Sequence, residues 1–109
     1  MRVTETTEIM SAEVVNNSTK YSETVSLKHI FGFSIASVWT GATTTGSVTV
    51  QASLDETTWF DTAATATISG PGSALFNVID ANYPFTRLKV VSADAHDVTI
   101  TAKIYCKGV

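Results

Sequence analysis

Residues 98–107 read VTITAKIYCK, and this stretch decides the fold. Every second residue is apolar, and the residues between them are Thr, Lys and Tyr. Successive side chains of a β-strand point to opposite faces of its sheet, so a period of two residues indicates a strand with one buried face. We therefore predict a half-buried strand here, with Cys106 as an ordinary buried thiol.

A second alternating stretch, FGFSIASVW at residues 31–39, places Phe, Phe, Ile, Ser and Trp at every second position. Shorter alternating or apolar runs follow, and turn signals such as Gly70-Pro71-Gly72 separate them. About seven or eight short strands without a helix-length amphipathic stripe are typical of an antiparallel two-sheet sandwich. We predict an all-β, single-domain sandwich. Alternation does not encode strand order, so jelly-roll and immunoglobulin-like topologies both stay open.

The N-terminal segment reads differently from the rest of the chain. Of the 109 residues, those from Val3 to Val15 show neither a strict alternation nor a helical stripe, and Ile9 and Met10 stand among glutamates. We expect residues 1–20 to form an extended N-terminal arm with the first strand, and residues 21–109 to form the sandwich domain. The N-terminus lacks the apolar region of a secretory signal, so synthesis in the cytoplasm is expected.

Charge and motifs exclude several classes of function. The net charge of −3, without a run of positive residues, argues against nucleic-acid binding, and no apolar stretch is long enough to span a membrane. His29 and His96 stand in no metal-binding spacing, and no phosphate-binding glycine loop is present. We therefore expect no metal, no cofactor and no catalytic residues, which means that the protein is not an enzyme.

Residues 53–59, SLDETTW, are similar to the Asp-box turn S-x-D-x-G-x-T-W, but they are one residue shorter and have Thr57 near the place of the glycine. We interpret them as a hairpin turn in which Asp55 caps backbone amides and Trp59 re-enters the core. The alternative interpretation is an aromatic platform for carbohydrate, formed by Trp59, Phe60 or Tyr83.

Charged residues divide unevenly along the chain. If the last two strands pair as a hairpin, one face carries four basic residues, whereas the first residues after Arg2 carry only glutamate as charge. Such a face is either solvated or binds the acidic arm of a neighbouring subunit. The expected assembly interface consists of the arm residues Val3, Ile9 and Met10 and the basic residues Arg87, Lys89 and Lys103.

Several segments resemble small β-sandwich virion proteins of tailed bacteriophages, a group that includes head decoration or cement proteins. The resemblance covers about residues 21–107, and the segments that carry it include VQAS at residues 50–53, followed by Trp59, and NYPFTRLK at residues 82–89, a pattern that also fits a tail or fibre module. It implies a protein that is made in the host cytoplasm and sits on the capsid surface. It also implies that the protein is a dimer or trimer and stabilises the capsid by bridging capsomers of the major capsid protein.

Two other functions stay open at this point. The first is a glycan-binding adhesion module of a phage tail or fibre, in which Trp59 and Tyr83 stack on sugar rings. The second is an intracellular immunoglobulin-like interaction domain. The resemblance implies no catalytic residues for this chain.

Overall fold

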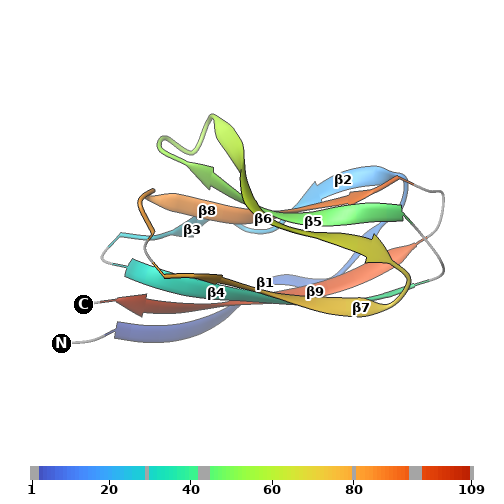
Figure 1. The fold of residues 1–109 in the computed structure, drawn as a ribbon, viewed down its shortest axis with the longest axis horizontal. Coiled ribbons are helices and arrows are strands. Elements are labelled where there is room, and N and C mark those ends of the chain that lie inside the picture. Colours follow the sequence, from blue (N-terminus) through green and yellow to red (C-terminus); the bar gives the residue numbers. More distant parts are fainter. Residues whose placement is uncertain (1–2, 29, 42–44, 80, 94–96, 109) are drawn as a thin grey trace.

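A computed structural model describes residues 3–28, 30–41, 45–79, 81–93 and 97–108. Over these residues the chain is all-β, with two antiparallel sheets packed face to face and no helix (Figure 1). The predicted two-sheet sandwich is therefore confirmed. The strands are β1 (Val3–Val15), β2 (Ser18–Tyr21), β3 (Val25–Ser26), β4 (Ile30–Gly41), β5 (Thr45–Ser53), β6 (Trp59–Ser69), β7 (Gly72–Val78), β8 (Phe85–Ser92) and β9 (Val98–Gly108).

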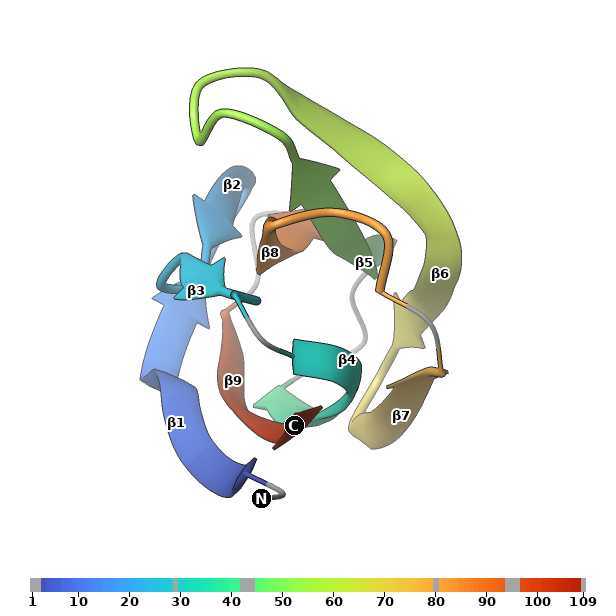
Figure 2. The same cartoon turned by 90° about the vertical axis from the view of Figure 1, so that its left-hand side faces the viewer.

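The strand order distinguishes between the two topologies. One sheet has the order β1-β9-β4-β7, and the other has the order β2-β8-β5-β6, with β3 also paired to β8. The last strand therefore lies between the first strand and β4, and β8 lies between β2 and β5. This interleaving of early and late strands in two sheets is the arrangement of a jelly roll. Figure 2 shows the two sheets enclosing the interior from opposite sides.

The core consists of alternate residues from both sheets. In β9, Ile100, Ala102, Ile104 and Cys106 are buried, as the sequence predicts. Trp39 is buried too, and its indole Nε1 donates a hydrogen bond to the Gly70 carbonyl at 2.9 Å. The remaining fully buried apolar side chains are Val15, Ile35, Val48, Val50, Ile68, Leu88, Val90 and Val98.

Within the N-terminal segment, Val3–Val15 form strand β1 of the sandwich. β1 pairs with β9 from Val3↔Gly108 to Val15↔Val98, with register shifts between Glu8 and Met10 and again before Glu13. The first shift lets two consecutive residues face inward, so Ile9 and Met10 are only 4% and 5% exposed. This bulge breaks the alternation and explains why the sequence does not read as a regular strand. As a correction, Ile9 and Met10 belong to the core and not to a surface for assembly.

Candidate functional site on the outer face of the five-stranded sheet

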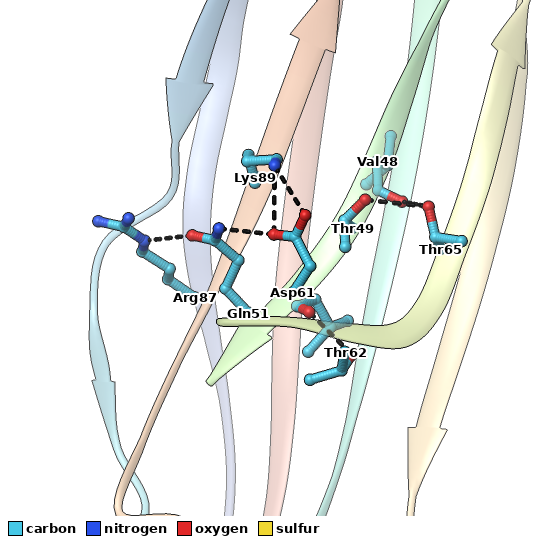
Figure 3. A network of polar contacts seen from close by, with 9 residues as sticks. Val48, Thr49, Gln51, Asp61, Thr62, Thr65, Arg87 and Lys89 are labelled. Carbon is cyan, nitrogen blue, oxygen red and sulfur yellow. Dashed lines mark hydrogen bonds and ion pairs between the residues drawn. The ribbon is translucent and has the colours of Figure 1, made fainter. Parts of the chain in front are cut away.

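The outer face of the sheet that contains β8 carries a cluster of polar side chains. Along β8 the residues alternate, so that Leu88 and Val90 point into the core while Arg87 and Lys89 point outward. The strand register places Gln51 of β5 opposite Arg87 and also opposite Asp61 of β6. Three neighbouring strands therefore bring these polar groups together (Figure 3).

A continuous chain of hydrogen bonds links the cluster across the three strands. The Arg87 Nε donates to Gln51 Oε1 at 2.8 Å, and Gln51 Nε2 donates to Asp61 Oδ1 at 2.8 Å. The Lys89 Nζ contacts the two Asp61 carboxylate oxygens at 3.0 and 3.2 Å. Although Gln51 lies on an outer sheet face, it is only 6% exposed, because its neighbours cover it. Both ends of the Gln51 amide are thus bound to charged partners, which fixes its orientation.

Two aromatic rings hold the Arg87 guanidinium. Its Cζ lies 3.9 Å from the ring centroid of Tyr21 and 4.1 Å from that of Trp59. A guanidinium over aromatic faces gains from the negative charge of the ring face. Partial burial lowers the pKa of Arg87 from its ordinary value, the nearby Tyr21 opposes this shift, and arginine stays charged at any physiological pH.

The geometry leaves part of the Arg87 side chain available. In Figure 3 its Nε points toward Gln51, and its two terminal nitrogens lie on the side away from Gln51. Among the described residues, no side chain or carbonyl forms a hydrogen bond to these two nitrogens. A stacked guanidinium of this kind presents two parallel N–H donors, which match a carboxylate or phosphate.

The Asp61 carboxylate makes the cluster sensitive to acid. Hydrogen bonding from Gln51, and then the contact with Lys89, lowers the pKa of Asp61 below its ordinary value. A lowered pKa in the folded state means that this contribution to stability is complete above the unfolded-state pKa of about 3.9. It is then lost as the pH falls through the lower folded-state pKa.

We predict that the wild-type melting temperature falls more steeply below about pH 4 than that of Asp61→Asn, because the variant has no carboxylate to protonate there. Near pH 7 the wild type is expected to be the more stable of the two. Thermal unfolding followed by circular dichroism from about pH 7 to pH 2.5 measures both effects. Parallel curves for the two proteins would contradict the assignment of the lowered pKa to Asp61.

The Ser53–Trp59 segment forms the predicted turn. The Asp55 Oδ1 accepts hydrogen bonds from the backbone N–H groups of Thr57 and Thr58, both at 2.9 Å, and this lowers the pKa of Asp55. The prediction for Trp59 is wrong, because its ring does not re-enter the core but lies on the outer face against Arg87. Of the residues of the alternative aromatic platform, Trp59 lies on this outer face and the other two lie elsewhere. Phe60 is exposed, and Tyr83 contacts Phe33 edge to face at 6.3 Å.

The expected basic face is wrong as well. Because β8 and β9 belong to different sheets, Arg87 and Lys89 lie on one outer face of the sandwich, and Lys103 lies on the opposite outer face. The backbone of Val3 pairs with Gly108, and its side chain lies outside the described part of the structure. Of the six expected assembly residues, the structure therefore brings together Arg87 and Lys89.

Sequence reasoning missed three members of the cluster, namely Tyr21, Gln51 and Asp61. Gln51 shares a face with Thr49 and Ser53 in the alternation of residues 48–54, and this is the sequence signal that places it outward. Its position beside Arg87 depends on strand pairing, which the alternation does not give.

A hollow of about 480 Å³ lies between the neighbouring edges of the two sheets, near β1 and β3. Its floor is apolar, with Ile9, Ile104 and the buried Cys106, and Glu23 and Lys28 lie at its rim. Over the described residues, no group of three or more His, Cys, Asp or Glu could hold a metal ion. His29 and His96 lie outside the described residues. The described part also contains no helix that is long and apolar enough to cross a membrane.

Comparison with known proteins shows the fold. No family model and no curated protein matches the sequence. The PBSX exported protein XepA is 8% identical with a TM-score of 0.70. The match covers 95% of this chain but only 36% of XepA. The SPBc2 prophage-derived protein YomS is 14% identical with a TM-score of 0.60, covering 97% of this chain and 96% of YomS. The family 29 carbohydrate binding module CBM29-2 is 13% identical with a TM-score of 0.54, and the match covers 95% of this chain and 86% of the module. At these identities the likeness establishes a shared β-sandwich fold.

Proposed function

We propose that the chain is a structural protein of a tailed-phage virion that binds between capsomers on the capsid surface and stabilises the capsid. Its partner in this proposal is the major capsid protein. The observation that carries the proposal is the match in fold with a prophage-derived protein over nearly the full length of both chains. The sandwich itself fits such a role, because its built polar cluster lies on an outer sheet face that can meet a flat partner surface.

The polar cluster suggests how this face would recognise a capsid. Arg87 is held by two rings and by Gln51, so its terminal N–H groups are oriented before a partner arrives. Binding then costs little side-chain entropy for this group. Together with Lys89 it would select acidic side chains on the partner, and repetition over the lattice would multiply a weak contact through effective concentration.

Purified protein is expected to bind expanded capsids that lack it and to raise the temperature at which they break. Arg87→Ala should weaken this binding at least about 10-fold, because a charge-assisted pair with the capsid is lost. Arg87→Lys should be intermediate, since it keeps the charge but loses the paired donors. Co-sedimentation with capsids measures the affinities.

Lys103→Ala is the matched control, because Lys103 lies on the opposite outer face and its loss should leave binding unchanged. Circular dichroism of each variant separates loss of contact from loss of fold. If the wild type binds no capsid state, the proposal is wrong. If Lys103→Ala loses binding while Arg87→Ala keeps it, the contact face is the other sheet. Mass spectrometry of purified particles adds the copy number, which is expected to be in the hundreds for a head protein.

A second candidate function is glycan binding at a phage tail or fibre. It is favoured by the rings of Tyr21 and Trp59 on the same face as Gln51 and by the likeness to a carbohydrate binding module. Arg87 covers one side of both rings, which leaves less aromatic surface for a sugar. A glycan array with Trp59→Ala as control distinguishes the two, because the capsid proposal expects no sugar to be bound by either protein.

A further inference from the structure

The edge strand β7 differs from the other sheet edges of the molecule. An edge strand presents backbone N–H and C=O groups that have no partner within its sheet, and proteins usually protect such edges with charges, bulges or breaks. β7 reads GSALFNV, without a charge or a proline. It pairs with β4 without any register shift, from Val78↔Phe33 to Gly72↔Trp39. Figures 1 and 2 show it along the border of the sandwich.

The other edges all carry a protecting feature. In the same sheet, β1 has two register shifts and contains Glu8 and Glu13. In the second sheet, β6 has a bulge between Asp61 and Thr65, where its pairing with β5 is interrupted. The opposite edge of that sheet is divided into β2 and β3. Over the described residues, β7 is therefore the regular and uncharged edge of the fold.

Exposed apolar side chains lie at the centre of this edge and on the strand beside it. Leu75, at the middle of β7, is 70% exposed on the outer face of its sheet. It lies opposite Ala36 of β4, and the exposed Val38 follows on the same face of that strand. An exposed apolar patch that continues to an open sheet edge marks a site for another protein.

We propose that β7 pairs with β7 of a second copy of this chain, antiparallel and around a twofold axis at Leu75. The strand has seven residues, so this register pairs Gly72 with Val78 of the second copy and Leu75 with its own equivalent. In this register, side chains on the outer face of one β7 lie beside side chains on the outer face of the other β7, as a continuous sheet requires. About six to eight backbone hydrogen bonds would form, and the two four-stranded sheets would become one.

The lack of charge on β7 allows a second copy of this chain to be its partner. A twofold axis places identical residues against each other, so any charge at the centre would repel its own copy. β7 carries none, and its centre is an exposed leucine that would be buried against the same leucine. This inference goes beyond the capsid proposal and does not depend on it, because it concerns the protein alone in solution.

The test is the mass of the purified protein, measured by light scattering between about 10 μM and 1 mM. The wild type is expected to dimerise in this range. Leu75→Lys is expected to self-associate about 100-fold more weakly, because it removes the buried leucine pair and opposes two like charges. The matched control is Leu54→Lys, because Leu54 is 71% exposed at the turn after β5 and should leave the dimer intact. Circular dichroism checks that each variant is folded.

A mixing experiment tests the register itself. Leu75→Lys and Leu75→Asp are each expected to be monomeric, and an equimolar mixture is expected to form a heterodimer, since residue 75 then faces an opposite charge across the axis. The proposal is overturned if the wild type is monomeric throughout the range or forms a trimer. It is equally overturned if Leu75→Lys remains dimeric or if the mixture stays monomeric.

Discussion

Ile35→Ala is expected to lower the free energy of unfolding by about 2–5 kcal/mol, which corresponds to a fall in melting temperature of about 8–40 °C. Ile35 is fully buried at the middle of β4, where it pairs with Phe76 of β7 on one side and Ile104 of β9 on the other. Removing its branched side chain leaves a cavity that the paired strands cannot close without losing backbone hydrogen bonds.

The same substitution at Ile79 is the control. Ile79 follows β7 and is 75% exposed, so Ile79→Ala is expected to change the stability by less than about 0.5 kcal/mol. Urea unfolding followed by fluorescence or circular dichroism gives both values. Equal losses for the two variants would mean that Ile35 is not in the core between the sheets.

Gly46→Ala is expected to destabilise the protein by about 3 kcal/mol or more. Gly46 lies in β5 beside β8, and a Cβ at this position would overlap the carbonyl oxygen of Val91. The obstacle is backbone and not the end of a flexible side chain. The two central strands must therefore separate to admit even one methyl group.

Gly70→Ala tests whether the effect comes from the clash. Gly70 has a φ of 80°, but a Cβ there would meet no atom within 4 Å. The expected cost is therefore conformational alone, about 1–2 kcal/mol. Comparing the two variants in the same urea titration gives the contribution of the contact. If Gly70→Ala is as damaging as Gly46→Ala, the close approach of β5 to Val91 is not the cause.

The sequence predicts the strands that have one buried and one exposed face. β9 and the middle of β4 alternate strictly because their inner residues meet the core while their outer residues meet water. The sequence pattern of residues 63–69 does not predict a strand there, because alanine and threonine are both small and contrast little between the two faces of β6. Residues 3–15 do not show the alternation of a regular strand, because the bulge in β1 turns Ile9 and Met10 inward together.

The candidate site was predictable only in part, for a related reason. Arg87 and Lys89 stand on one face by alternation within a single strand. Their grouping with Lys103 assumed that neighbours in sequence pair in space, whereas the connection from β8 to β9 crosses from one sheet to the other. Gln51 joins the cluster through its hydrogen bond with Arg87, which lies 36 positions later in the sequence. A local pattern of apolar and polar residues does not predict which distant strands pair.

The pairing of β1 with β9 has a consequence for how the chain is made. The two strands lie at opposite ends of the described sequence, yet they pair from Val3↔Gly108 to Val15↔Val98. Because synthesis adds only about 5–20 residues per second, β9 is synthesised several seconds after β1. Folding of this sheet is thus completed only after translation of β9. Until then β1 has no partner strand, and its glutamates help to prevent pairing with other chains.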